Sequence, residues 1–78
     1  MSWRVVLGDA ALEGLSASEE EAVTTQLFAW VESGPPMRNP RDLRGAQLFE
    51  DELPTGHRVS YFVDASVPYV AIVRVRRS

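Results

Sequence analysis

Apolar residues are concentrated in three short segments in the second half of the chain, each with the length and composition of a β-strand. The segments cover residues 46–53, 57–64 and 69–76. Pro54-Thr55-Gly56 separates the first two, and these residue types favour tight turns. Residues 65–68 separate the last two. The pattern therefore predicts three consecutive strands joined by short turns.

The first half of the chain begins with one more strand. There Trp3, Val5 and Leu7 alternate with Arg4, Val6 and Gly8, and the middle of the segment is apolar on both sides. Asp9 then has the side chain of a helix N-cap. Ala11, Leu12 and Leu15 follow it at helical spacing, so a short helix is predicted here.

A second and longer helix is predicted after it. Ser16 or Ser18 caps this helix, and Ser18 with Glu21 fits the capping-box spacing. Ser33-Gly34-Pro35-Pro36 ends it, because glycine and proline terminate helices. Its apolar residues repeat with the helical period and predict one buried face: Ala22, Val23, Leu27, Phe28, Trp30 and Val31.

This order of elements, β-α-α-β-β-β, predicts an α+β fold. A helical hairpin would pack on one face of a mainly antiparallel four-stranded sheet. Seventy-eight residues correspond to a single domain, residues 1–78, with one modest core. Many domains of this size gain stability from a partner, so a homodimer or a heteromer is expected.

The last two strands form a hairpin that gathers cationic side chains. If Asp64 faces Tyr69 across the turn, the remaining pairs follow one by one. Uninterrupted pairing sets Val59 opposite Arg74, Ser60 opposite Val73, Arg58 opposite Val75 and His57 opposite Arg76. The open end of the hairpin then carries His57, Arg58, Arg74 and Arg76. Such a cluster is a candidate anion site.

Composition narrows the chemistry further. The chain has no cysteine and no lysine, which excludes disulfides, thiolate zinc sites and Schiff-base catalysis. The net charge is −3, and it is unevenly spread. Residues 1–36 carry one arginine and six acids, whereas residues 37–78 carry seven arginines and five acids. With no apolar run of about 18 residues and no signal-peptide pattern, we expect a cytoplasmic protein that is not bound to a membrane.

The residues and their order resemble the RelE/ParE superfamily of bacterial toxins from type II toxin–antitoxin systems. Three features carry the resemblance. Leu43-Arg44-Gly45 precedes the second strand, and Gly56-His57-Arg58-Val59-Ser60-Tyr61 resembles the family's third-strand motif. The chain also closes with an apolar strand that ends in basic residues, 70–77. The similarity covers about residues 3–77.

The resemblance implies a toxin that an antitoxin protein holds inactive, without a cofactor or metal. RelE-like members cut mRNA on the ribosome, and ParE-like members poison DNA gyrase. In the RelE-like branch, the arginine at the position of Arg58 contacts the scissile phosphate. A second arginine, matched here by Arg76 or Arg77, stabilises the transition state. His57, beside Arg58, is a candidate general base.

The sequence departs from the RelE-like pattern in ways that favour other outcomes. Glu50 and Glu52 stand where nucleases carry basic residues, the chain stops at Ser78 before a tail with a catalytic tyrosine, and the whole protein is acidic. These departures weaken the expectation of a metal-independent mRNA endoribonuclease. They favour a ParE-like toxin or, as an alternative, a non-catalytic interaction module that keeps the toxin fold. An unrelated small α+β domain is a third reading.

Structural roles compete with these functional ones. Arg58 could pair with Glu50 or Glu52, and the C-terminal arginines could keep a strand edge soluble. The acidic run Glu50-Asp51-Glu52 could hold a cation together with Asp64. Alternation along a strand points Asp51 away from its two neighbours, so a solvated or arginine-paired run is the stronger reading.

Overall fold

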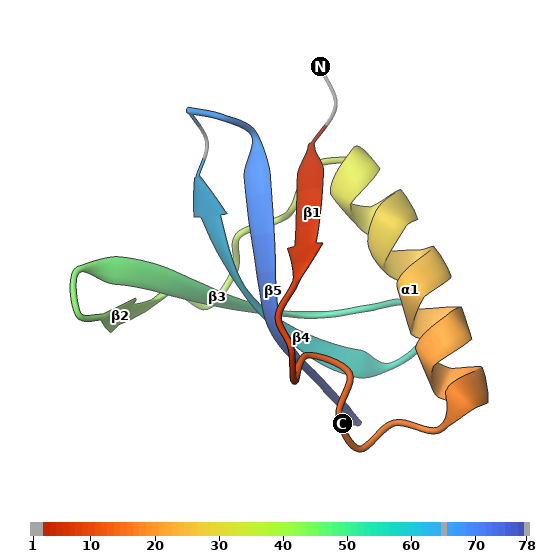
Figure 1. Cartoon of the computed structure of the whole chain (residues 1–78). Coiled ribbons are helices and arrows are strands. Elements are labelled where there is room, and N and C mark those ends of the chain that lie inside the picture. Colours follow the sequence, from red (N-terminus) through yellow and green to blue (C-terminus); the bar gives the residue numbers. More distant parts are fainter. Residues whose placement is uncertain (1–2, 65, 78) are drawn as a thin grey trace.

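The computed structural model describes residues 3–64 and 66–77, which fold into one helix packed on a curved sheet (Figure 1). The elements in chain order are β1 (Arg4–Leu7), α1 (Ala17–Glu32), β2 (Arg41–Leu43), β3 (Ala46–Glu52), β4 (His57–Asp64) and β5 (Tyr69–Arg77). The three strands predicted in the second half are confirmed to within one residue at their ends.

The sheet has the strand order β1-β5-β4-β3-β2. Its first pair, β1 with β5, is parallel, and the other pairs are antiparallel. The α+β class and the mainly antiparallel sheet are therefore confirmed. The predicted four strands and the helical hairpin are wrong in detail, because β2 adds a fifth strand and α1 is the one helix of the described residues.

The short helix predicted after Asp9 is replaced by a series of turns. The amide groups of Ala11, Glu13 and Leu15 each donate to the carbonyl oxygen three residues earlier, at 3.1–3.2 Å. No ladder to the fourth residue forms, and Gly14 has a φ of 90°, outside helical geometry. The Ala11 carbonyl instead accepts from the amide of Val75 at 2.7 Å. Binding to β5 thus competes successfully with local helix formation.

Helix α1 begins at a capping box. Ser16 Oγ accepts from the amide of Glu19 at 3.2 Å, and the Glu19 carboxylate accepts from the amide of Ser16 at 3.1 Å. The box predicted for Ser18 and Glu21 therefore lies two residues too late, since both pairs have the required spacing. None of the described helical residues make a segment long and apolar enough to cross a membrane.

One stripe of α1 is buried, at Val23, Leu27 and Val31. These residues are spaced by four, so they lie on one side of the helix. Phe28 was predicted to be buried but is 58% exposed, because it points about a quarter turn away from this stripe. The strands contribute Phe49, Val59, Tyr61, Val70, Ile72 and Val75 to the core, and Ala11 and Leu53 join it from the connecting segments.

Strand β2 belongs to a tight hairpin with β3 that the sequence pattern did not predict. Arg44 and Gly45 form its turn with φ angles of 53° and 86°. Positive φ at both central residues is typical of the two-residue turns whose twist matches paired strands. Arg41 consequently lies opposite Leu48 on β3, and Leu43 lies opposite Ala46.

The pairing of β4 with β5 shifts by one residue in mid-strand. From Asp64 and Tyr69 to Tyr61 and Ile72 the predicted register is confirmed. Val73 is then an extra residue on β5, and Ser60 pairs with Arg74. The bulge sets Val59 opposite Val75, where uninterrupted pairing had predicted Arg74. The predicted pairs beyond the bulge are wrong, because that register would have brought a guanidinium into the core beside Val59.

Candidate functional site

The bulge at Val73 divides the four predicted site residues between the two faces of the sheet. Arg58 lies opposite Arg76, and His57 lies opposite Arg77. Directly opposed residues share a face, and neighbours along a strand alternate. Val59 is buried under α1, so His57 and Arg77 lie on the helix side. Arg58 and Arg76 lie on the other side, called here the open face.

On the open face, Glu50 of β3 contacts two arginines. Glu50 Oε1 lies 3.3 Å from the Arg41 guanidinium, and Glu50 Oε2 lies 3.5 Å from that of Arg76. The Glu50 side chain is only 14% exposed, whereas those of Arg41 and Arg76 are 72% and 53% exposed. A mostly buried carboxylate therefore contacts two guanidiniums that remain exposed.

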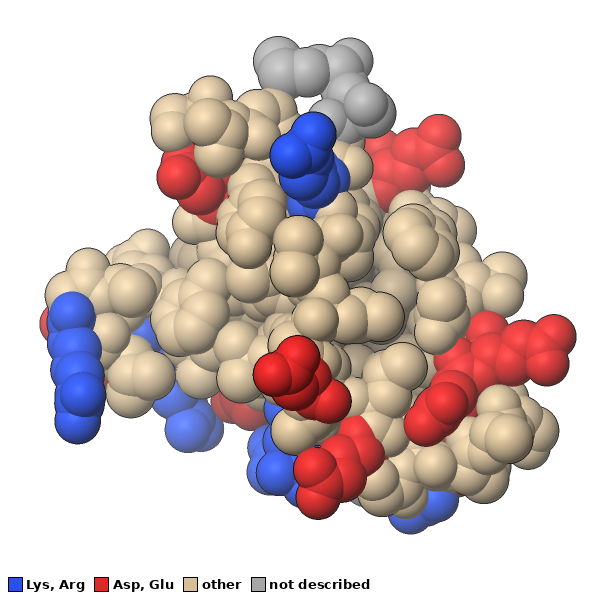
Figure 2. Space-filling model, in the orientation of Figure 1, with Lys and Arg blue, Asp and Glu red and all other residues tan. Residues whose placement is uncertain are grey.

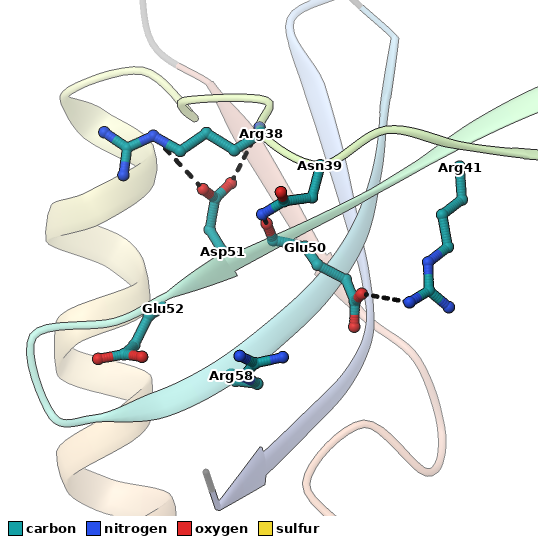
Figure 3. A pocket seen from close by; sticks show the side chains of 7 residues that line it. All are labelled: Arg38, Asn39, Arg41, Glu50, Asp51, Glu52 and Arg58. Atoms are coloured by element: carbon teal, nitrogen blue, oxygen red, sulfur yellow. Dashed lines mark hydrogen bonds and ion pairs between the residues drawn. The ribbon is translucent and has the colours of Figure 1, made fainter.

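Arg58 stands beside this group without an ion pair within the described residues. It lies opposite Glu52 on β3, and both side chains are exposed (Figure 3). The expected alternative, in which Arg58 pairs with Glu50 or Glu52, is not the arrangement found. Glu50 pairs with Arg41 and Arg76 instead.

A hollow of about 410 Å³ opens at this place between the chain before β2 and strands β3 and β4 (Figure 3). Its lining is almost wholly charged or polar: Arg38, Asn39, Arg41, Glu50, Asp51, Glu52 and Arg58. Such a lining suits a charged, hydrated ligand better than an apolar one.

Asp51 belongs to the other face, as alternation predicted. It is buried, and Tyr61 Oη donates to its Oδ2. The Tyr61 oxygen also accepts from the amide of Met37 at 2.8 Å. Burial, and then the hydrogen bond to Asp51, raise the pKa of Tyr61 well above its usual range. This pair was missed from sequence, although Asp51 falls in phase with the buried Phe49 and Leu53.

His57 and Arg77 meet Glu19 at the start of α1. Arg77 Nε donates to Glu19 Oε2 at 2.8 Å, and a second guanidinium nitrogen of Arg77 contacts Oε1. His57 Nε2 lies 3.0 Å from Glu19 Oε2, and His57 Nδ1 lies 2.9 Å from Thr55 Oγ1. Arg77 first, then His57 and Ser16, lower the pKa of Glu19 well below its usual range. Reciprocally, hydrogen bonding to Glu19 raises the pKa of Arg77.

Asp64 does not join the acidic run. It lies at the far end of β4, where it accepts from the amide and hydroxyl of Ser66 at 3.1 and 2.6 Å. These bonds lower the pKa of Asp64. Within residues 3–64 and 66–77, no group of three or more histidine or acidic side chains is placed to hold a metal ion.

The unequal charge of the two halves of the chain appears on the surface. Figure 2 shows acidic side chains over the first half of α1 and basic ones at the tip of the β2–β3 hairpin, on the opposite side of the molecule. A negatively charged ligand would be repelled by the helix side and attracted to the β2 and β3 end.

Comparison with known proteins gives a fold but no sequence family. No protein-family model matches the chain, and no curated protein matches it either. Among solved structures, a chain of the toxin–antitoxin complex RelBE2 from Mycobacterium tuberculosis is similar at a TM-score of 0.69 and 22% identity, over the full length of both chains. A chain of the intact RelBE toxin–antitoxin complex from E. coli is similar at a TM-score of 0.66 and 21% identity, over 99% and 98% of the two chains. This chain therefore has a RelE-type fold, as its resemblance to the RelE/ParE superfamily in the order of elements and in residues 56–61 had led us to expect.

Proposed function

We propose that this protein is the toxin of a type II toxin–antitoxin pair, neutralised by a small antitoxin protein. The observation that carries the proposal is the opposition of Arg58 and Arg76 on the face that α1 leaves uncovered. Its support comes from the end-to-end likeness to chains from two complexes described as toxin–antitoxin complexes.

Arg58 and Arg76 are proposed as a pair of phosphate clamps. Opposed residues of neighbouring strands have Cα atoms about 5 Å apart, so both guanidiniums can reach one phosphate group. Negative charge builds on the phosphoryl oxygens during transfer, and guanidinium donors placed against them stabilise it. Arg41 and Arg74 lie on the same face and extend its positive charge.

The same geometry favours Arg76 over Arg77 as the second arginine. Arg76 shares the open face with Arg58, whereas Arg77 lies on the helix side and contacts Glu19 there. His57 has both ring nitrogens in hydrogen bonds, to Glu19 and Thr55. We therefore assign His57 and Arg77 to fastening the start of α1 onto β4 and β5, away from the clamps.

The proposed target is nucleic-acid phosphate, either in ribosome-bound mRNA or in the DNA complex of gyrase. The test is induced expression in a bacterial host, with pulse-labelled protein and DNA synthesis followed together. Loss of protein synthesis would support mRNA cleavage. Loss of DNA synthesis with a damage response would support gyrase poisoning. Co-expression of the gene beside the toxin gene should restore growth if it encodes the antitoxin.

A second candidate function is a non-catalytic module that pairs with another chain. Glu50 favours it, because its carboxylate occupies two of the arginines that a phosphate would need. Normal growth during expression of soluble, folded protein would support this candidate and contradict the toxin.

A further inference from the structure

Glu50 has the charge and the surroundings of a bound anion. Its two oxygens each face a guanidinium from a different strand, Arg41 on β2 and Arg76 on β5, at 3.3 and 3.5 Å. A carboxylate and a phosphodiester each carry one negative charge over two terminal oxygens, and arginine binds both in the same manner. The Glu50 carboxylate thus stands where a phosphodiester group would fit.

The backbone of Glu50 is held from one side by the chain before β2. Its amide donates to the Arg38 carbonyl at 3.0 Å, and its carbonyl accepts from Asn39 Nδ2 at 3.1 Å. Along the other side of β3, Glu50 lies opposite Ser60 of β4. A strand anchored on both sides presents its side chain in a fixed direction, so the carboxylate stays near Arg41 and Arg76.

Glu52 provides an internal comparison. It lies two residues further along β3 and therefore on the same face. Glu52 is exposed and makes no ion pair with the described residues, whereas the Glu50 side chain is only 14% exposed between its two arginines. Two glutamates on the same face of the same strand thus have different environments.

We propose that Glu50 is a built-in competitor for the phosphodiester site of the open face. A phosphate of a single-stranded nucleic acid would reach Arg41 and Arg76 only by displacing this carboxylate, while Arg58 remains available beside them. This inference rests on the proposed function for its biological meaning. The inference itself is that Glu50 weakens the binding of phosphodiesters because it occupies Arg41 and Arg76.

The experiment compares Glu50→Gln with Glu52→Gln as a matched charge control. The probe is a short fluorescently labelled single-stranded RNA, with a single-stranded DNA of the same sequence in parallel. Fluorescence anisotropy gives the dissociation constant over a series of salt concentrations. Circular dichroism and thermal unfolding show that each variant remains folded, which is expected because glutamine has nearly the shape of glutamate.

Glu50→Gln should bind the probe about tenfold more tightly at low salt, because two arginines become available. The salt dependence of log K should steepen by about 0.7 for each additional phosphate contact. Glu52→Gln should gain about twofold only, the effect of one screened charge. Whether RNA or DNA gains more identifies the source of the phosphodiester.

A second substitution tests whether the gain in binding depends on Arg76. In the Glu50→Gln background, Arg76→Gln should remove most of the gain, whereas Arg4→Gln should keep it, because Arg4 lies on β1 at the far edge of the sheet. Equal gains in Glu50→Gln and Glu52→Gln, or a gain that survives Arg76→Gln, would overturn the inference. So would unchanged binding by a folded Glu50→Gln protein.

The binding experiment can fail or succeed independently of the growth-arrest test of the proposed function. If the natural protein does not arrest growth but Glu50→Gln binds the probe through Arg76, the toxin proposal fails and the inference stands. If the natural protein arrests growth and Glu50→Gln binds no more tightly, the inference fails and the toxin proposal stands.

Discussion

Val59 of β4 lies directly opposite Val75 of β5, and both side chains are fully buried. The pair exists because Val73 is an extra residue on β5. The same shift places Arg76 opposite Arg58 on the open face and leaves Arg77 to reach Glu19. One bulge therefore completes the core and arranges the charged residues on both faces.

A double-mutant cycle should detect the Val59–Val75 contact. Val59→Ala and Val75→Ala should couple by about 1 kcal/mol, because residues in contact are not additive. Val59→Ala and Arg74→Ala should be additive within about 0.3 kcal/mol, since Arg74 lies on the other face. Urea denaturation of the single and double variants provides the free energies. Coupling of Val59 to Arg74 instead would support the uninterrupted register.

Removing the Tyr61 hydroxyl should destabilise the protein. Tyr61→Phe leaves the buried Asp51 carboxylate without this donor and the Met37 amide without its acceptor. An unsatisfied buried polar group costs about 1–3 kcal/mol, so urea denaturation should show a loss of that order. Tyr69→Phe is the matched control and should change stability by less than about 0.5 kcal/mol. A stability equal to that of the natural protein would show that the hydrogen bonds are not net stabilising.

The contacts of Glu19 should make folding stability dependent on acid pH. Its pKa is lowered in the folded state, so its contribution is complete above the unfolded pKa of about 4.3 and is lost as the pH falls further. Glu19→Gln should be less stable than the natural protein at about pH 7, and the difference should shrink toward about pH 2. Urea midpoints at several pH values measure this difference.

Glu20→Gln is the matched control, because Glu20 also lies in the first turn of α1. It should show a smaller dependence on pH than Glu19→Gln. A difference between Glu19→Gln and the natural protein that stays constant with pH would remove the ionised Glu19 from the explanation.

Arg58→Ala should relieve growth arrest while the protein stays folded. Arg58 is exposed and has no ion pair with the described residues, so its replacement should change stability by less than about 0.5 kcal/mol. Growth curves during induced expression measure toxicity, and thermal unfolding checks the fold. Arg4→Ala, on the far edge strand, should remain as toxic as the natural protein. Undiminished toxicity of Arg58→Ala would exclude Arg58 from the mechanism.

Local patterns in the sequence were enough to predict β4 in full and β5 to within one residue. Alternation places Val59 and Tyr61 on one face and Arg58 and Ser60 on the other, whatever the partner strand. The same rule separated Asp51 from Glu50. The face on which a residue lies depends on its position within its own strand, and this position can be read from the sequence.

Alternative local solutions explain several of the errors. Two serine–glutamate pairs fit the capping box, and the structure has the one of Ser16 with Glu19, whose carboxylate also contacts His57 and Arg77. Ala11, Leu12 and Leu15 have helical spacing, yet the carbonyl of Ala11 accepts a hydrogen bond from the amide of Val75 on β5. Phe28 follows the apolar period of α1 but falls outside the stripe that meets the sheet.

Alternation within β4 is enough to place Arg58 on the face opposite Val59 and Tyr61, whichever strands lie beside it. It could not show that Arg76 lies opposite Arg58, that Arg77 and His57 contact Glu19, or that Glu50 lies between Arg41 and Arg76, because these contacts arise from folding. The period of a strand depends on its own residues, whereas its register depends on which pairing with a neighbouring strand buries the most apolar surface. Here that pairing requires a bulge, and no pattern within β5 alone shows where it falls.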